Sequence, residues 1–274
     1  MRRTLFLLLA AFLPIGASLL TGSEAGAAAT IMVINNDPAD EGFNDPTPAA
    51  PVGGNPGATL GAQRLIAFQY AADIWAPLIT SAVPLRISAN FSSLECDAFS
   101  AVLGSAGPTT VHRDFTGAPL AQTWYVQALA NSLRGSDLDS GNNDMEAEFN
   151  RDIGSPGCLQ TSGWYYGLDG NTPVDKIDFV SVLLHELGHG LGFLSLVSLS
   201  TGSKFLNAND AYMVHLEDHS TGKSFPEMSS AERFTASRRT GSLHWTGANV
   251  MFGGAALIDG RDPSGHVEMY APNP

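Results

Sequence analysis

The strongest constraint on this chain is one nine-residue stretch, residues 185–193, with the sequence HELGHGLGF. It continues an apolar run with helical spacing, so a mostly buried helix is expected. Side chains four positions apart share one face of a helix, so His185 and His189 can offer imidazole nitrogens to one metal ion. Glu186 lies one step round the helix, where it can reach a water molecule on that metal.

The same letters could belong to an ordinary helix whose histidines bind nothing. Unpartnered imidazoles on a buried helix would be costly, however. Gly188, Gly190 and Gly192 are poor helix formers, each costing about 1 kcal/mol relative to alanine. Such residues are kept where the backbone approaches a neighbour closely or turns sharply. We therefore interpret the stretch as a zinc site with His185 and His189 as ligands and Glu186 as general base.

The first 27 residues have the pattern of a secretory signal peptide. Arg2 and Arg3 precede an apolar segment, residues 5–13, and the small residues 25–27 form an A-x-A cleavage pattern. We expect cleavage there and a protein that is secreted or periplasmic. No later segment approaches the roughly 20 apolar residues that a membrane span needs.

The cysteine and charge content fit an exported protein. Cys96 and Cys158 suit an oxidising compartment and are expected to form a disulfide, with a zinc thiolate pair as the weaker alternative. The net charge of -13 argues against nucleic acids and anionic membrane surfaces as partners.

The pattern of apolar residues predicts an α+β fold with a mixed twisted sheet, a backing helix and the active-site helix. The expected elements are strands 30–35, 84–91 and 145–149, helices 60–79 and 123–133, and a loop over residues 37–56. Strand 145–149 is expected at the sheet edge beside the cleft, where an extended peptide could add as a further strand. We divide the mature chain into an N-terminal subdomain, residues 28–194, and an irregular C-terminal subdomain, residues 195–274.

The stretch resembles the metzincin clan of zinc peptidases, whose pattern is H-E-x-x-H-x-x-G-x-x-H. His185, Glu186, His189 and Gly192 match it, whereas Ser195 stands where the third histidine would be. A long segment after the glycine makes the chain more similar to the leishmanolysin-like branch, in which the third histidine comes much later. The resemblance implies a zincin-like catalytic domain, one catalytic Zn²⁺ and a secreted metalloendopeptidase. It also leads us to expect a longer chain, continuing past residue 270 into the third-ligand segment.

Several residues within the chain could supply the third zinc ligand. The better placed ones are His244, His266 and Glu232, and the others are His215, His219 and Asp210. The remaining possibility is a residue beyond the C-terminus. Met251 could form a methionine turn behind the metal, but we favour the interpretation as an ordinary apolar residue in a strand.

A second metal pattern is weaker. Asp137, Asp139, Asn143 and Glu148 fall at positions 1, 3, 7 and 12 of a calcium-loop spacing. The glycine stands at position 5 instead of 6, so we interpret the segment as an acidic surface loop, with Ca²⁺ as the alternative.

The predicted function is hydrolysis of peptide bonds in a peptide or protein substrate by a zinc-activated water, with Glu186 moving the proton. One alternative is a catalytically degenerate exported protein that keeps the zincin fold as a binding module. Another is a zinc hydrolase that acts on a different bond. The sequence specifies neither the cleavage preference nor the oligomeric state.

Overall fold

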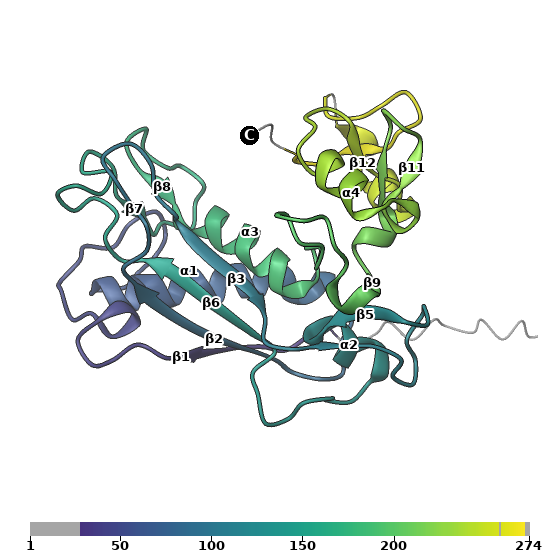
Figure 1. Ribbon diagram of the computed structural model, residues 1–274. Coiled ribbons are helices and arrows are strands. Elements are labelled where there is room, and N and C mark those ends of the chain that lie inside the picture. Colours follow the sequence, from purple (N-terminus) through teal and green to yellow (C-terminus); the bar gives the residue numbers. More distant parts are fainter. Residues whose placement is uncertain (1–27, 258, 272–274) are drawn as a thin grey trace, which may run out of the picture.

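The computed structural model describes residues 28–257 and 259–271, so the predicted signal peptide lies outside the described residues. The chain is a mixed α and β structure, as predicted (Figure 1). None of the described helices is both long and apolar enough to cross a membrane. The α-helices are α1 Leu60–Trp75, α2 Gln127–Arg134, α3 Phe179–Leu191, α4 Ser230–Ala236 and α5 Ala248–Gly253. The strands are β1 Ile31–Asn35, β2 Leu85–Ser92, β3 Gly104–Pro108, β4 Val111–His112, β5 Thr123–Val126, β6 Met145–Asn150, β7 Trp164–Tyr165, β8 Ile177–Asp178, β9 Asn209–Asp210, β10 Leu216–Asp218, β11 Lys223–Ser224, β12 Leu243–Trp245 and β13 Val267–Glu268.

The main sheet has the strand order β1-β2-β6-β3. Strands β1, β2 and β6 are parallel, and β3 runs antiparallel to β6. Side chains of β2 and β6 alternate between a buried and a more exposed face, as a sheet covered on one side requires. Helices α1 and α3 contribute their buried side chains to the core on the covered face. The predicted backing helix and active-site helix therefore share one side of the sheet.

Aromatic packing joins this sheet to both helices. Phe68 of α1 lies with its ring centroid 5.9 Å from that of Phe149 in β6, and Phe149 lies 5.1 Å from Phe179 at the start of α3. Both pairs meet edge to face, a favoured geometry for buried rings. The two helices are also linked directly, because the Trp75 indole N–H donates to the Leu184 carbonyl at 3.2 Å.

The prediction of an edge strand at residues 145–149 was wrong. These residues form β6, an interior strand, and the edge belongs to β3. Residues 104–108 read GSAGP, a composition depleted in strands. Their strand conformation depends on pairing with β6, a long-range contact that local composition does not encode.

The predicted helix over residues 123–133 begins four residues late. Residues 123–126 form β5, which pairs with β4 and, in parallel, with β9 from much later in the chain. Only from Gln127 does α2 follow, and it ends at Gly135, whose φ of 73° is the left-handed conformation common at helix ends. Tertiary pairing again overrides the local helical periodicity.

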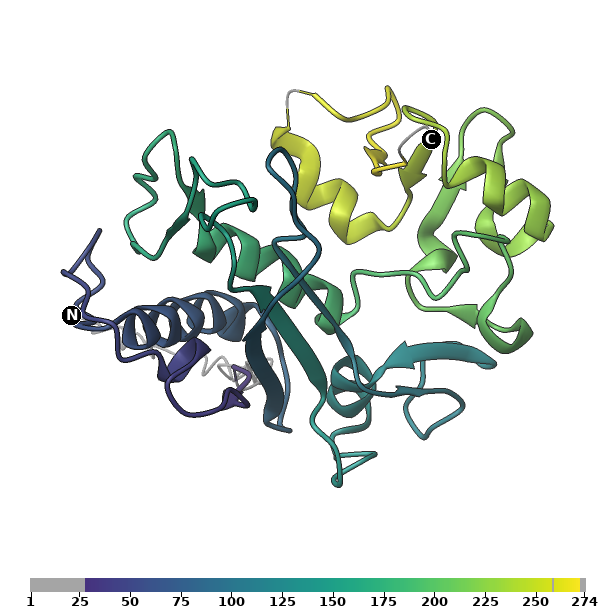
Figure 2. The same cartoon turned by 60° about the vertical axis from the view of Figure 1, so that its left-hand side comes forward.

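The C-terminal region is more regular than predicted. It holds a sheet of order β11-β10-β12-β13 and the two short helices α4 and α5. Its buried cluster draws on residues 197–271, whereas the main core draws on residues 29–187. The boundary predicted near residue 194 falls between these clusters. In Figures 1 and 2, the C-terminal region, coloured light green to yellow, lies past the C-terminal end of α3.

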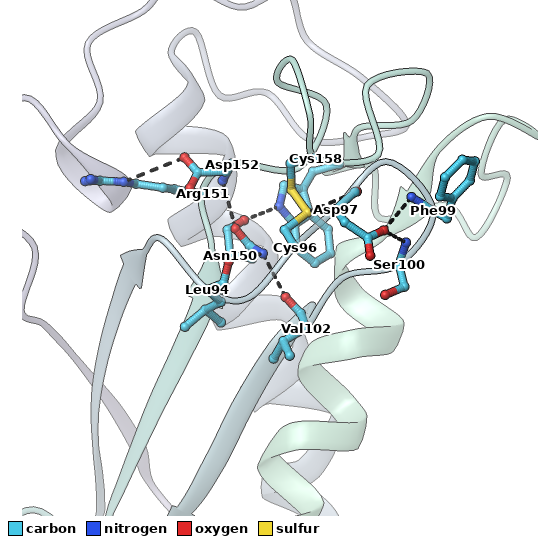
Figure 3. Close-up of a disulfide and its surroundings, with 11 residues drawn as sticks. Leu94, Cys96, Asp97, Phe99, Ser100, Val102, Asn150, Arg151, Asp152 and Cys158 are labelled. Carbon is cyan, nitrogen blue, oxygen red and sulfur yellow. Dashed lines mark hydrogen bonds and ion pairs between the residues drawn. A yellow bond between two sulfur atoms is a disulfide. The ribbon is translucent and has the colours of Figure 1, made fainter.

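The predicted disulfide between Cys96 and Cys158 is confirmed. It ties the loop after β2 to the loop after β6 (Figure 3). The same two loops are joined by a hydrogen bond from the Leu159 N–H to the Asp97 carbonyl, at 2.9 Å. Close by, the Asn150 side-chain amide donates to the Val102 carbonyl at 2.9 Å.

Reduction of this disulfide should lower the free energy of unfolding by roughly 2–4 kcal/mol, because the bond closes a long loop in the unfolded chain. The sequence separation of the cysteines is 62 residues. Urea unfolding with and without dithiothreitol measures the effect. The double variant Cys96→Ser, Cys158→Ser should match the reduced protein and show no further response to dithiothreitol. Equal stability of the oxidised and reduced proteins would contradict the expectation.

Candidate metal centre

Helix α3 carries the histidine pair, and its buried side chains fix its position from the first residue onward. Its N-cap is Asp178, whose carboxylate accepts from the Ser181 hydroxyl at 2.5 Å and makes no capping bond to the backbone. Phe179 follows and is fully buried. The buried face of α3 continues through Val180, Leu183 and Leu187, so the helix cannot rotate without exposing this stripe.

The two histidines of α3 face one another across one helical turn. Their Nε2 atoms are 3.1 Å apart, and the ring planes are nearly perpendicular at 89°. Two nitrogens bound tetrahedrally to Zn²⁺ at about 2.0–2.1 Å would be roughly 3.3 Å apart. The spacing of His185 and His189 therefore fits two ligands of one zinc ion. The His185 side chain is exposed and His189 is half-buried, so the pair can be reached from solvent.

A backbone carbonyl orients His189. Its Nδ1 lies 2.8 Å from the Phe193 carbonyl oxygen. A carbonyl can only accept, so Nδ1 carries the proton and Nε2 keeps the lone pair that a metal needs. This is the arrangement usual for metal-ligating histidines, whose second nitrogen is fixed by an outer partner.

The turn after α3 brings that carbonyl into place. Gly192 ends the helix with φ 119° and ψ 4°, and the Phe193 N–H donates back to the Gly188 carbonyl at 2.9 Å. The Phe193 ring then packs against Tyr212 and Trp245, with centroids 5.0 and 5.7 Å apart. The helix end and the C-terminal region therefore meet through this aromatic contact.

The three glycines of the stretch have different surroundings. A Cβ at Gly190 would lie 3.1 Å from the Cβ of fully buried Met145, and closer still to its sulfur, so the helix approaches the sheet only because this side chain is absent. Gly192 is required by its positive φ. A Cβ at Gly188 would meet Trp75 at 3.7 Å, an ordinary contact, so neither packing nor conformation accounts for that glycine.

The structure brings together a different group from the predicted one. Across residues 28–257 and 259–271, the one set of three or more ligand-type side chains close enough to share a metal is His219, Asp262 and His266. His185 and His189 are thus joined by no third ligand among the described residues. Glu186 is half-buried beside the pair.

Each candidate third ligand has another partner. His266 belongs to the group just named, and His244 stacks on His219 with ring centroids 3.9 Å apart. Glu232 of α4 accepts from the Ser229 backbone N–H and from Lys223. His215 packs on Trp245 at 4.9 Å.

Asp210, another candidate third ligand, has its carboxylate occupied by hydrogen bonds. It is buried and accepts from the Ser195 hydroxyl at 3.0 Å and from the backbone N–H of Leu196, Tyr212 and Met213. Ser195, which stands where the sequence resemblance would require the third histidine, is therefore engaged with this carboxylate.

One further sequence interpretation is corrected. Met251 lies in α5, so it belongs neither to a turn nor to a strand. Among the described residues, the predicted calcium ligands do not form a shared group. Glu148 lies in β6 and pairs with Ser92, while Asp139 caps the local turn by accepting from Asn142 at 2.9 Å. Residues 137–143 lie in the loop between α2 and β6, as the acidic-loop interpretation expected.

Comparisons of the chain with protein-family models, with curated proteins and with solved structures found no match.

The glycines of α3 should respond differently to alanine. Gly190→Ala should lower the free energy of unfolding by about 1–3 kcal/mol through overpacking. Gly192→Ala should cost about 1–2 kcal/mol because an L-residue is strained at this φ. Gly188→Ala should raise stability by up to about 1 kcal/mol, since alanine is the better helix former. Chemical denaturation of the three variants measures these changes, and equal effects at all three positions would contradict the assignment.

Acidification should destabilise the contact between His215 and Trp245. Burial lowers the pKa of His215 below its usual 6.5, so the unfolded chain binds the proton more readily. Stability from this residue is present above pH 6.5 and is lost as the pH falls below it. Urea unfolding at pH 7.5 and 5.5 should show a smaller pH dependence for His215→Gln than for wild type. The same dependence in both proteins would contradict the expectation.

Proposed function

We propose that the protein is an exported zinc-dependent metallopeptidase with a zincin-like catalytic domain, His185 and His189 as zinc ligands and Glu186 as the general base. The observation that carries the proposal is the facing pair of Nε2 atoms, 3.1 Å apart, with the His189 tautomer set by the Phe193 carbonyl. Two imidazoles so arranged supply two of the three protein ligands of a catalytic zinc site, and the adjacent glutamate supplies its base. The disulfide is in keeping with an oxidising compartment.

The chain's own residues have separate tasks in this proposal. Zinc bound at such a site supplies Lewis acidity and makes water a nucleophile at neutral pH. Glu186, which follows His185 on the same helix, accepts the proton of the attacking water and returns it to the departing amine. The Nδ1 of His189 contacts the Phe193 carbonyl, which leaves Nε2 as the nitrogen that would bind the metal.

The position of β3 supports a peptide as the substrate. This strand forms the edge of the main sheet and packs beside α3 (Figure 1). Its side chains are small, Ser105 is exposed and the other four residues are partly buried. An extended peptide could pair with a strand in this edge position by main-chain hydrogen bonds. Pro108 ends the strand without a backbone N–H, so pairing would rely on residues 104–107.

The proposal requires a third ligand in addition to the helix pair. Two imidazoles alone would hold zinc weakly and would not define its coordination geometry. A catalytically degenerate binding protein is therefore the second candidate function. Tight zinc binding at the helix pair together with turnover would separate the peptidase from the binding module.

Glu186→Gln should keep the zinc of the helix site and lower kcat for a peptide substrate by about 10²- to 10⁴-fold, the usual contribution of a general base. His189→Ala should lose the zinc of the helix site together with the activity. The measurements are zinc content by elemental analysis and hydrolysis of a quenched fluorescent peptide library.

The matched control is Glu95→Gln, which makes the same change at an exposed glutamate in the loop after β2. It should keep full activity. Full hydrolysis by Glu186→Gln would exclude Glu186 as the base. Absence of hydrolysis by the wild-type protein with zinc bound at the helix pair would favour the binding module.

A further inference from the structure

We propose that His219, Asp262 and His266 form a second zinc site in the C-terminal region, separate from the histidine pair of α3. The proposal goes beyond the proposed function and does not depend on peptidase activity. It begins with the distances between the donor atoms. His266 Nδ1 lies 3.1 Å from His219 Nε2 and 3.4 Å from Asp262 Oδ2. Tetrahedral zinc with bonds near 2.0–2.1 Å separates its donors by roughly 3.3 Å.

A tight turn holds Asp262 and His266 in this arrangement. The His266 N–H donates to Asp262 Oδ1 at 2.7 Å, and the Asp262 N–H donates to the His266 carbonyl at 3.1 Å. Gly265 supports the turn with φ 88°. Since Oδ1 is used inside the turn, Oδ2 is the oxygen that faces both imidazoles.

His219 comes from a different element. It follows β10, and its N–H donates to the Ser242 carbonyl at 2.9 Å, which extends the pairing towards β12. The buried His244 ring stacks on the His219 ring at a 3.9 Å centroid separation with 8° between planes. Two backbone segments far apart in sequence thus present rigidly placed donors to one point.

The surroundings also suit a cation. Glu217 Oε1 lies 3.5 Å from His219 Nε2 and adds a second carboxylate at the margin of the group. The side chains of His219 and His266 are each 22% exposed and that of Asp262 is 15% exposed, so the donors are shielded yet open to an ion from solvent.

The donor set selects the metal class. Two imidazoles and one carboxylate are typical of Zn²⁺ and related transition ions, whereas Ca²⁺ and Mg²⁺ prefer oxygen donors alone. A bound ion would link the end of β10 to the loop before β13. The expected consequence is therefore stabilisation of the C-terminal sheet, measurable without any substrate.

The test uses the double variant His185→Ala, His189→Ala, which lacks the helix pair. It should bind one zinc per chain by elemental analysis after dialysis, and added zinc should raise its melting temperature while added magnesium should not. Introducing His266→Ala into this background should remove both effects. Introducing His215→Ala, a histidine of the same region outside the group, should preserve them.

Circular dichroism in EDTA verifies the fold of each variant. Should His266→Ala unfold, Asp262→Asn serves instead, because it keeps an oxygen for the turn and removes the charge at the site. Absence of zinc from the double variant, or zinc binding that persists after both the His266 and Asp262 substitutions, would overturn the second site. If the helix pair binds no zinc, wild type and the double variant will hold equal amounts of zinc. The second site is judged by the zinc content of the double variant alone, so the two proposals are tested separately.

Discussion

The packing of α3 on the main sheet is the contact on which the rest of the molecule depends. At the start of the helix, Phe179 is enclosed by the rings of Phe91, Phe149, Trp164 and Tyr166, with centroids between 5.1 and 5.4 Å. At the other end, Gly190 lets the backbone lie directly against Met145. A helix fixed at both ends offers its histidines from a rigid backbone, which is what a metal site of defined geometry needs.

The turn at the C-terminal end of α3 orients the His189 ring. The left-handed conformation of Gly192 reverses the chain so that the Phe193 carbonyl meets the His189 ring. The Phe193 side chain makes the aromatic contact with Trp245. One turn therefore sets the tautomer of a proposed ligand and attaches the C-terminal region. A change that displaces the Phe193 ring should also alter the contact between the Phe193 carbonyl and His189.

The two histidine groups arise in different physical ways. In α3 the spacing of four residues on a helix is sufficient to make His185 and His189 neighbours. In the C-terminal region, His219 and His266 are 47 residues apart and meet only because β10, β12 and β13 pair in register. The first group can be recognised by eye in a sequence, and the second cannot.

The sequence by itself determined the features that depend on local periodicity: the α+β class, strands β1 and β2, helix α1, the position of α3 and the pairing of the only two cysteines. Tertiary structure decided what depends on partners distant in the chain. It made the Gly- and Ser-rich residues 104–108 the edge strand in place of 145–149, and it converted residues 123–126 from helix to β5. It also grouped His266 with His219 instead of with His185. Strand pairing and side-chain convergence are properties of the folded chain, and local residue patterns carry little information about them.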